Sequence, residues 1–237
     1  MDDSMSSAIS VLPAQPAAKR FGYRFVKRGF DIVASAVGLV VLSPLMLLSA
    51  SLIKAYDGGP VLYKQVRLTK NGKRFKIIKF RSMRVDAEED GVARLSTGDR
   101  DPRITPVGHF LRSCRLDELP QLINILRGDM SVVGPRPERP EIAAEYEKLL
   151  PDFKLRLQVK AGLTGYAQVY GKYNTNPCEK LKLDLLYINE MNVLTDVELI
   201  FHTFRILFSK ESTEGAESLT GWMGGEESKR EKEAVKL

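Results

Sequence analysis

An unbroken run of 22 uncharged residues, 32–53, constrains the fold of this chain more than any other feature. Most of these residues are apolar, and a helix of about 20 such residues can cross the hydrocarbon core of a bilayer. Pro44 follows Ser43 near the middle of the run, where a proline removes a backbone hydrogen bond and bends a helix. The Ser43 hydroxyl can satisfy the backbone group that is freed. The run therefore predicts a membrane segment that is broken at its centre.

Basic residues flank this run on both sides. Those before it are Lys19, Arg20, Arg24, Lys27 and Arg28, and those after it are Lys54, Lys64 and Arg67. Because basic flanks tend to stay on the cytoplasmic side, both ends are expected there, and the run would enter and leave the same leaflet as a re-entrant hairpin. The flanks leave a second topology open, in which a kinked helix crosses the bilayer once.

Two adjacent carboxylates, Asp117 and Glu118, stand among arginines and before apolar residues at helical spacing. This pattern places them in the first turn of a helix, where N–H groups and the helix dipole attract phosphate and keep a carboxylate ionised. A phosphoryl group at this point would meet an anionic nucleophile, with Arg112, Arg115 and Arg136 available to neutralise its oxygens. The alternative is that Asp117 only caps the helix and Glu118 is an ordinary first-turn acid.

The net charge of +6 is unevenly distributed along the chain. Residues 60–85 contain nine Lys or Arg and no acidic residue. Such a block suits nucleotide diphosphates or anionic lipid headgroups, whereas nucleic acid is not expected, because few aromatic residues and no recognition motif accompany it. The two cysteines, Cys114 and Cys178, form no disulfide framework, and the two histidines are too far apart for a histidine-ligated metal site.

Residues 61–68 and 75–83 alternate apolar and basic positions around Asn71-Gly72, which predicts a β-hairpin. Lys79 and Arg81 would share one face and could bind a diphosphate, although their stems could instead cover apolar surface. Residues 86–101 are predicted to form a mobile loop, and 138–150 and a segment from Leu181 are predicted helices. The apolar segment 197–208 is too short to span a bilayer, so it packs in the core or lies at the membrane interface.

The acidic pair belongs to a longer pattern. Arg112 is followed after four residues by Asp117-Glu118, then by Gly-Asp-Met-Ser at 128–131 and Gly-Pro-Arg-Pro at 134–137. This pattern resembles that of the bacterial sugar transferases, the monotopic polyprenyl-phosphate phosphoglycosyl transferases. The resemblance covers about residues 21–209. It includes Lys27, Arg28 and Asp31, where the family's chain enters the membrane, and the Ser43-Pro44 break, which favours the re-entrant topology.

The resemblance implies an α+β, membrane-associated monotopic enzyme with one re-entrant broken helix, interfacial amphipathic helices and a small catalytic domain containing the hairpin. Its expected regions are a disordered tail (1–20), a basic flank and re-entrant helix (21–56), a catalytic domain (57–209) and a disordered charged tail (210–237). The expected location is the cytoplasmic face of the bacterial inner membrane. The chain resembles the small form of the family, which has no extra N-terminal membrane spans.

The implied reaction moves a sugar-1-phosphate from a UDP-sugar to a polyprenyl phosphate such as undecaprenyl phosphate. It releases UMP through a covalent aspartyl-phosphosugar intermediate and initiates the assembly of an exopolysaccharide, capsule, O-antigen or other glycan. Asp117 would be the nucleophile and Glu118 a base or metal-supporting group, both beside Mg²⁺. The implied substrate-binding residues are Arg112, Lys79, Arg81, Arg136, Asp184 and Gln168. Further expected partners are the lipid bilayer, a second copy of the chain and downstream glycosyl transferases.

Several alternatives stay open at this point. Asp184 could pair with a nearby Lys or Arg instead of supporting a ligand. In the segment 160–169, Gly162 and Gly165 allow positive φ and close backbone approach, but Ala161 replaces a proline that the family's loop normally has. The chain could also be a catalytically idle scaffold for polysaccharide assembly, or a glycosyl transferase that moves only the sugar and releases UDP.

Overall fold

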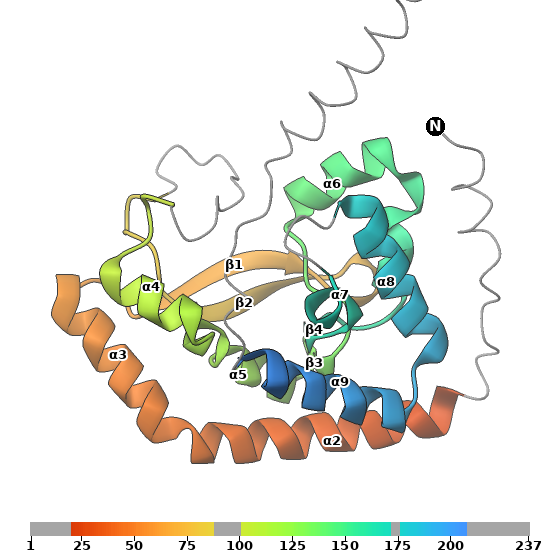
Figure 1. Cartoon of the computed structure of the whole chain (residues 1–237), viewed down its shortest axis with the longest axis horizontal. Helices are drawn as coiled ribbons and strands as arrows, with labels where there is room; N and C mark the ends of the chain where they lie inside the picture. Colours follow the sequence, from red (N-terminus) through yellow and green to blue (C-terminus); the bar gives the residue numbers. More distant parts are fainter. Residues whose placement is uncertain (1–19, 88–100, 172–175, 208–237) are drawn as a thin grey trace, which may run out of the picture.

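The computed structural model describes residues 20–87, 101–171 and 176–207. The predicted tails, except residue 20, and most of the loop predicted at 86–101 lie outside these residues. The fold mixes helices with two small sheets, in agreement with the α+β prediction. In Figure 1 a long bent helix pair runs along one side of the molecule, with the hairpin at the centre and the later helices around it.

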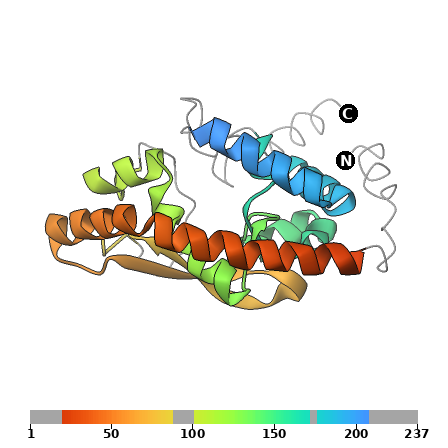
Figure 2. The ribbon, with the colours of Figure 1, turned by 90° about the horizontal axis from the view of Figure 1, so that it is seen from below.

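The bent pair consists of α2 (Arg20–Val41) and α3 (Ser43–Asp57), which meet at an angle of 60°. Figure 2 shows α2 extending along the molecule, with α9 (Val193–Leu207) on one side and the hairpin on the other. No single helix in the described part of the chain is long and apolar enough to span a membrane. Together, α2 from Gly22 onward and α3 pass that test by length and composition.

The break between the two helices has the local chemistry that the sequence predicts. Pro44 lacks the N–H that would otherwise bond to the carbonyl of Val40. The Ser43 hydroxyl donates to that carbonyl oxygen instead, at 2.7 Å. The bend therefore leaves the Val40 carbonyl hydrogen-bonded, which an apolar surrounding requires.

The predicted hairpin is present as β1 (Leu62–Leu68) and β2 (Arg74–Phe80), which pair antiparallel. Asn71 and Gly72 at its turn have φ values of 59° and 72°. Positive φ at both central positions matches the right-handed twist of the strands and explains the Asn-Gly sequence. Strand β2 ends at Phe80, so Arg81 and Met83 lie beyond it, although the sequence pattern predicted strand as far as 83.

A second, parallel pair of short strands escapes the sequence analysis. It joins β3 (Ser131–Val133) to β4 (Gly162–Thr164). A Cβ on Gly162 would lie 2.1 Å from the Gly134 nitrogen, and one on Gly165 would lie 2.3 Å from the Gly134 oxygen. The close backbone approach that these glycines allow is present, whereas neither glycine adopts the left-handed conformation that they also allow.

Helix α2 is attached to the remainder of the protein by three of its charged side chains. The Asp31 carboxylate accepts from the Ser131 hydroxyl at 3.0 Å and from the Val132 N–H at 2.9 Å. Arg28 donates to the last carbonyls of α5 (Gln121–Arg127), and Lys27 binds Asp196 on α9 at 2.8 Å. Lys27, Arg28 and Asp31, expected where the chain enters the membrane, therefore contact the predicted catalytic domain directly.

The remaining helices enclose the core. They are α4 (Pro106–Ser113), α6 (Pro140–Leu149), α7 (Tyr166–Val169) and α8 (Pro177–Glu190), with short 3₁₀ helices at Lys70–Gly72, Leu116–Glu118 and Pro151–Gln158. Helices α6 and α8 confirm the two predicted helices, α8 beginning four residues before Leu181, at Pro177, and the apolar segment 197–208 lies in α9 as far as Leu207. Apolar residues of α5 pack on β2 and on the middle of the α2–α3 pair.

Asn124 joins α5 to the edge of β2 that β1 leaves unpaired. Its amide accepts from the Ile78 N–H and donates to the Lys76 carbonyl, each at 2.9 Å, and the residue is 1% exposed. These contacts fix the helix that directly follows the acidic pair.

Asn124→Ala should strongly destabilise the protein. It leaves a buried N–H and a buried carbonyl without a partner, which costs about 2–4 kcal/mol and lowers Tm by about 5–15 °C. Thermal unfolding in detergent checks this. Leu126→Ala is the matched control on the same helix, because Leu126 is 37% exposed, and it should lower stability by less than about 1 kcal/mol. Equal losses in both variants would contradict the role of Asn124.

Candidate active site

Asp117 and Glu118 lie in the 3₁₀ helix Leu116–Glu118, directly before α5. The sequence analysis placed them in the first turn of the α-helix itself, but α5 begins only at Gln121. Arg115 precedes them with φ of 53°, a left-handed conformation that is uncommon outside glycine. This turn carries the chain from the end of α4 into the 3₁₀ helix, where both carboxylates become buried.

Glu118 is held by two cations. Its Oε1 accepts from Lys79 Nζ at 2.7 Å and from Arg136 Nη2 at 2.9 Å, and the residue is 9% exposed. Burial alone would raise the pKa of Glu118, but the charges of Arg136 and Lys79 outweigh it and hold that pKa well below the usual range. Glu118 is therefore ionised at neutral pH and is a weak proton acceptor.

Asp117 has a different environment, although it is the adjacent residue. It is 8% exposed, and within the described residues no hydrogen bond or ion pair reaches its carboxylate. Burial raises the pKa of Asp117, the neighbouring Glu118 charge raises it further, and Lys79 and Arg112 oppose both effects. The structure thus brings the charges of Lys79, Arg112 and Arg136 to a carboxylate that accepts no hydrogen bond from the described part of the chain.

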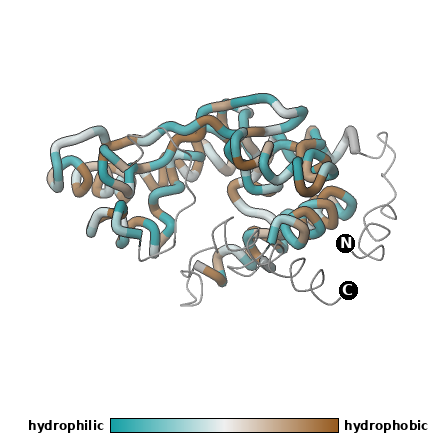
Figure 3. Tube along the Cα trace, turned by 90° about the horizontal axis from the view of Figure 1, so that it is seen from above, coloured by the Kyte–Doolittle hydropathy of each residue, from teal (hydrophilic) through white to brown (hydrophobic). Residues whose placement is uncertain are grey.

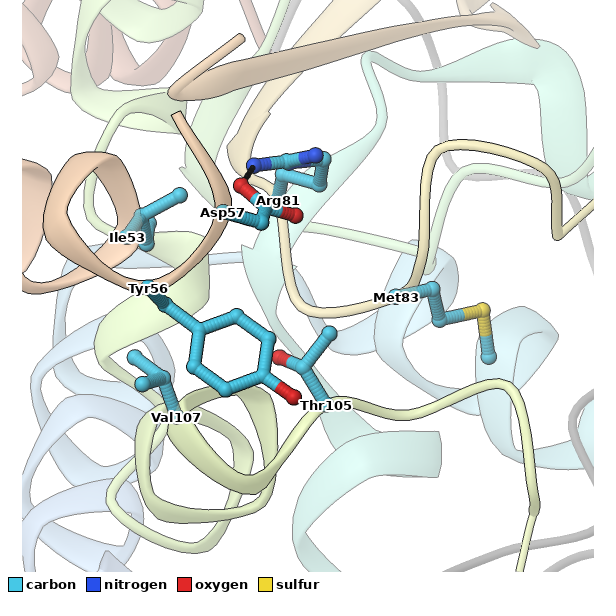
Figure 4. Close-up of a pocket in the computed structure, with 7 residues that line it drawn as sticks. All are labelled: Ile53, Tyr56, Asp57, Arg81, Met83, Thr105 and Val107. Atoms are coloured by element: carbon cyan, nitrogen blue, oxygen red, sulfur yellow. Dashed lines mark hydrogen bonds and ion pairs between the residues drawn. The ribbon is translucent and has the colours of Figure 1, made fainter. Parts of the chain in front are cut away.

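Arg81 lies elsewhere. It is 8% exposed and forms an ion pair with Asp57 at the end of α3, beside a pocket lined also by Tyr56, Met83 and Thr105 (Figure 4). Its Nη1 atom has no hydrogen-bond partner in the described part of the chain. Lys79 and Arg81, which the hairpin pattern placed at one diphosphate, thus bind different carboxylates, Glu118 and Asp57 respectively.

Asp184 is buried in an ion pair with Arg156, at 2.6 Å between the Asp184 Oδ2 and Arg156 Nη2 atoms. This confirms the alternative that Asp184 pairs with a basic residue. Arg156 also donates to the backbone carbonyl of Arg136 at 2.9 Å and lies 3.5 Å from Glu138. Glu138 in turn binds Lys180. A series of contacts therefore links Asp184 to the acidic pair: Asp184 binds Arg156, Arg156 binds the Arg136 carbonyl, and the Arg136 side chain binds Glu118.

Gln168 lies on α7, close to the backbone of Gly165 and Gly134. Both polar atoms of its amide are buried, and neither has a hydrogen-bond partner within the described residues. An unpaired buried amide is costly, so a hydrogen bond to a ligand would be favourable here. Its expected role in substrate binding stays a prediction.

The expected Mg²⁺ stays a prediction, which the chemistry of the acidic pair fits in part. Among the residues that the structure describes, no three side chains of the metal-binding types are grouped as a metal site. Mg²⁺ commonly uses one or two carboxylates together with substrate phosphates, and the unoccupied oxygens of Asp117 fit that arrangement. Glu118 fits it less well, because Lys79 and Arg136 already bind its Oε1.

Sequence reasoning missed Arg156, Glu138 and Asp196. Asp196 binds Tyr23 and Lys27 of α2 and Tyr187 of α8. These three residues have partners that are distant in the sequence, so local spacing could not have identified the three as site residues. The local sequence offers only a weak signal, namely that Arg156 stands between Leu155 and Leu157.

Comparisons with known proteins agree with these features. A family model described as bacterial sugar transferase matches residues 22–210. The chain is 39% identical over 190 residues to UDP-N-acetylgalactosamine-undecaprenyl-phosphate N-acetylgalactosaminephosphotransferase of Aeromonas hydrophila, covering 79% of this chain and 44% of that protein. It is 43% identical over 185 residues to UDP-glucose:undecaprenyl-phosphate glucose-1-phosphate transferase of Escherichia coli K12, covering 76% of this chain and 39% of that protein.

A shorter relative matches over nearly its whole length. This is the exopolysaccharide production protein PSS of Rhizobium leguminosarum bv. phaseoli, 43% identical over 187 residues, which cover 75% of this chain and 92% of the relative. The chain spans less than half the length of the first two relatives.

Glu138 should make stability depend on pH. Burial alone would raise its pKa, but Lys180 and Arg156 lower it to about 2 from the ordinary 4.5. Its contribution to stability is therefore complete above pH 4.5 and is lost as the pH falls toward 2. We expect about 3 kcal/mol of unfolding free energy to disappear over that window.

Chemical denaturation at a series of pH values between 4.5 and 2 measures how the unfolding free energy changes with pH. In Glu138→Gln, the fall in unfolding free energy over this window should be smaller by the contribution of Glu138. Glu145→Gln is the control, because Glu145 is half-exposed and pairs only with Lys148 at the surface of α6, and it should keep the wild-type slope. If the unfolding free energy of Glu138→Gln depended on pH as steeply as that of the wild type, Glu138 would not be the source of this pH dependence.

Proposed function

Because the chain belongs to the bacterial sugar transferase family, we propose that it moves a sugar-1-phosphate from a UDP-sugar to undecaprenyl phosphate and releases UMP. The printed names of two relatives specify a UDP-sugar donor and this lipid acceptor. The observation that carries the proposal for this chain is Asp117, a buried carboxylate beside Lys79 and Arg136 that accepts no hydrogen bond from any residue the structure describes. The product would be the first lipid-linked sugar of an exopolysaccharide or related glycan.

In the first step, an Asp117 oxygen attacks the phosphorus that carries the sugar. The bond from that phosphorus to the bridging oxygen breaks, and UMP leaves with the electron pair. A covalent aspartyl-phosphosugar group remains on the enzyme. Positioning and electrostatic stabilisation supply most of the rate enhancement in phosphoryl transfer, so the cations around Asp117 are the important surroundings.

Glu118 acts here chiefly as an anion that orders the cations. Its low pKa makes it a weak base, whereas its ion pairs hold Lys79 and Arg136 beside Asp117. Arg112 on α4 adds positive charge from the other side. Mg²⁺, held by Asp117 with Glu118 and the diphosphate, would neutralise charge on the phosphate oxygens.

In the second step, an oxygen of the lipid phosphate attacks the same phosphorus. The bond to Asp117 breaks, its carboxylate is regenerated, and a polyprenyl diphosphate sugar is released. The two steps use one nucleophile and need no base stronger than the phosphate dianion itself.

The exposed surface supports a membrane location. Large apolar side chains are more than half exposed on four helices: Phe25, Val33 and Val40 on α2, Leu47 on α3, Phe110 on α4, and Leu194, Phe201 and Phe204 on α9. In Figure 3 the helices carry both hydrophobic and hydrophilic positions, as amphipathic helices do. We infer that α2 and α3 enter one leaflet from the cytoplasmic side and return, and that α9 lies at the interface.

Asp117→Asn should lower UMP release by at least about 10³-fold, because an amide cannot replace an anionic nucleophile. The assay supplies purified protein with a panel of UDP-sugars, Mg²⁺ and undecaprenyl phosphate. Radiolabel in the phosphate next to the sugar should attach to wild-type protein when the lipid is omitted, and not to Asp117→Asn.

The outcomes of this assay separate the candidate functions. Full activity of Asp117→Asn would refute the nucleophile assignment. Release of UDP in place of UMP would indicate simple glycosyl transfer. If Asp117, Glu118 and Arg112 could all be replaced without loss of cellular function, the chain would be a scaffold and not a transferase.

The re-entrant topology predicts that Arg24 and Lys64 lie on the same side of the membrane. Both side chains are exposed in the structure. Arg24→Cys and Lys64→Cys, each in a Cys114→Ser, Cys178→Ser background, should react with an impermeant maleimide in inverted vesicles and not in intact spheroplasts. Labelling of the two positions from opposite sides would establish a helix that crosses the bilayer once.

A further inference from the structure

The segment that carries Arg136 is fixed through its own backbone. Three successive carbonyl oxygens, those of residues 136, 137 and 138, accept hydrogen bonds from three different groups. The donors are, in order, Arg156 Nη2 at 2.9 Å, Arg67 Nη1 at 3.2 Å and the Leu68 N–H at 2.9 Å. Two of these donors come from β1 and one from the 3₁₀ helix Pro151–Gln158. The backbone that carries the Arg136 side chain is thus held by hydrogen bonds at three successive residues.

Arg156 is the most deeply buried of these donors, at 2% exposure, and its own partner Asp184 is 1% exposed. The Asp184 Oδ2 atom accepts a hydrogen bond from Arg156 Nε at 2.8 Å and forms an ion pair with Arg156 Nη2 at 2.6 Å. The guanidinium also lies over the Phe153 ring, 4.8 Å from its centre. These contacts leave one orientation in which Nη2 still reaches the Arg136 carbonyl.

We propose that Arg156, oriented by Asp184, is a positioning residue that directs the Arg136 guanidinium to Glu118. The inference rests on the proposed function and deepens it, because Arg136 is one of the cations expected to bind the donor phosphates. The connection runs from Asp184 through Arg156 to the Arg136 carbonyl, and from the Arg136 side chain to Glu118 Oε1 at 2.9 Å. Misplacing such a group by about 1 Å can cost about a hundredfold in rate.

A purely structural role for Arg156 would be to neutralise Asp184. Lysine could do that with its charge, but it lacks the planar fork that donates to Asp184 and to a carbonyl at the same time. Arg156→Lys therefore distinguishes the two roles. Asp184→Asn tests the same connection with a side chain of nearly the same volume. It replaces Arg156→Lys in the experiment if the lysine variant does not fold.

We expect Arg156→Lys to lower kcat about ten- to a hundredfold, with a smaller change in the KM for the UDP-sugar, in protein whose thermal unfolding shows it to be folded. In an Arg136→Gln background the same substitution should change kcat less than about twofold, because the group it positions is already absent. Equal fold losses in both backgrounds would overturn the proposal.

A second readout does not depend on turnover. The Nε–H signal of Arg136 in ¹⁵N NMR, assigned by its loss in Arg136→Gln, reports the ion pair with Glu118. Arg156→Lys should move this signal toward its position in Glu118→Gln. An unmoved signal in folded Arg156→Lys would overturn the proposal, whereas a wild type that releases no UMP from any donor would contradict only the proposed function.

Lys180→Met is the matched control. Lys180 binds Glu138 in the same buried network but does not contact the Arg136 carbonyl. This variant should lower Tm without moving the Arg136 signal or lowering kcat more than about twofold. Losses equal to those of Arg156→Lys would show that the network acts only through stability.

Discussion

The hydrogen bonds that Asp31 accepts from β3 are the constraint on which the remaining structure depends. Asp31 is 2% exposed on a helix whose other face carries apolar residues, and a carboxylate buried there must be satisfied by donors. The donors are the Ser131 hydroxyl and the Val132 N–H, so β3 has one possible position along α2. Helix α2 is therefore part of the scaffold of the candidate site.

Strand β3 transmits this position to the site because the chain continues from it directly into residues 134–138. Gly134 lies so close to Gly162 and Gly165 that a side chain on either would collide with its backbone. Arg136 then reaches Glu118 on the 3₁₀ helix, and Lys79 reaches the same oxygen from β2. Three separate elements thus meet at a single carboxylate oxygen, which fixes their relative positions around Asp117.

Features that depend on neighbouring residues were predictable from the sequence. The bend at Ser43-Pro44, the turn at Asn71-Gly72 and the clustering of Arg112, Asp117 and Glu118 each follow from local geometry or a short motif. Contacts between distant residues were not predictable, as with Asp31 and Ser131 or Arg156 and Asp184. Arg81 shows the limit of a periodic pattern, because the alternation gave it the same expected ligand as Lys79 but could not identify Asp57 as its partner in the structure.

The contrast between Asp117 and Glu118 follows from this arrangement and not from their residue types. Glu118 receives the two strong donors, so it is stabilised as an anion and is a poor nucleophile. Asp117 receives the electrostatic benefit of the same cations without being bonded to them, and burial raises its pKa. The two carboxylates thus differ in their surroundings: Lys79 and Arg136 bind Glu118, whereas the same cations act on Asp117 only through their charge. In the proposed mechanism, Glu118 leaves Asp117 available as the nucleophile by binding Lys79 and Arg136 itself.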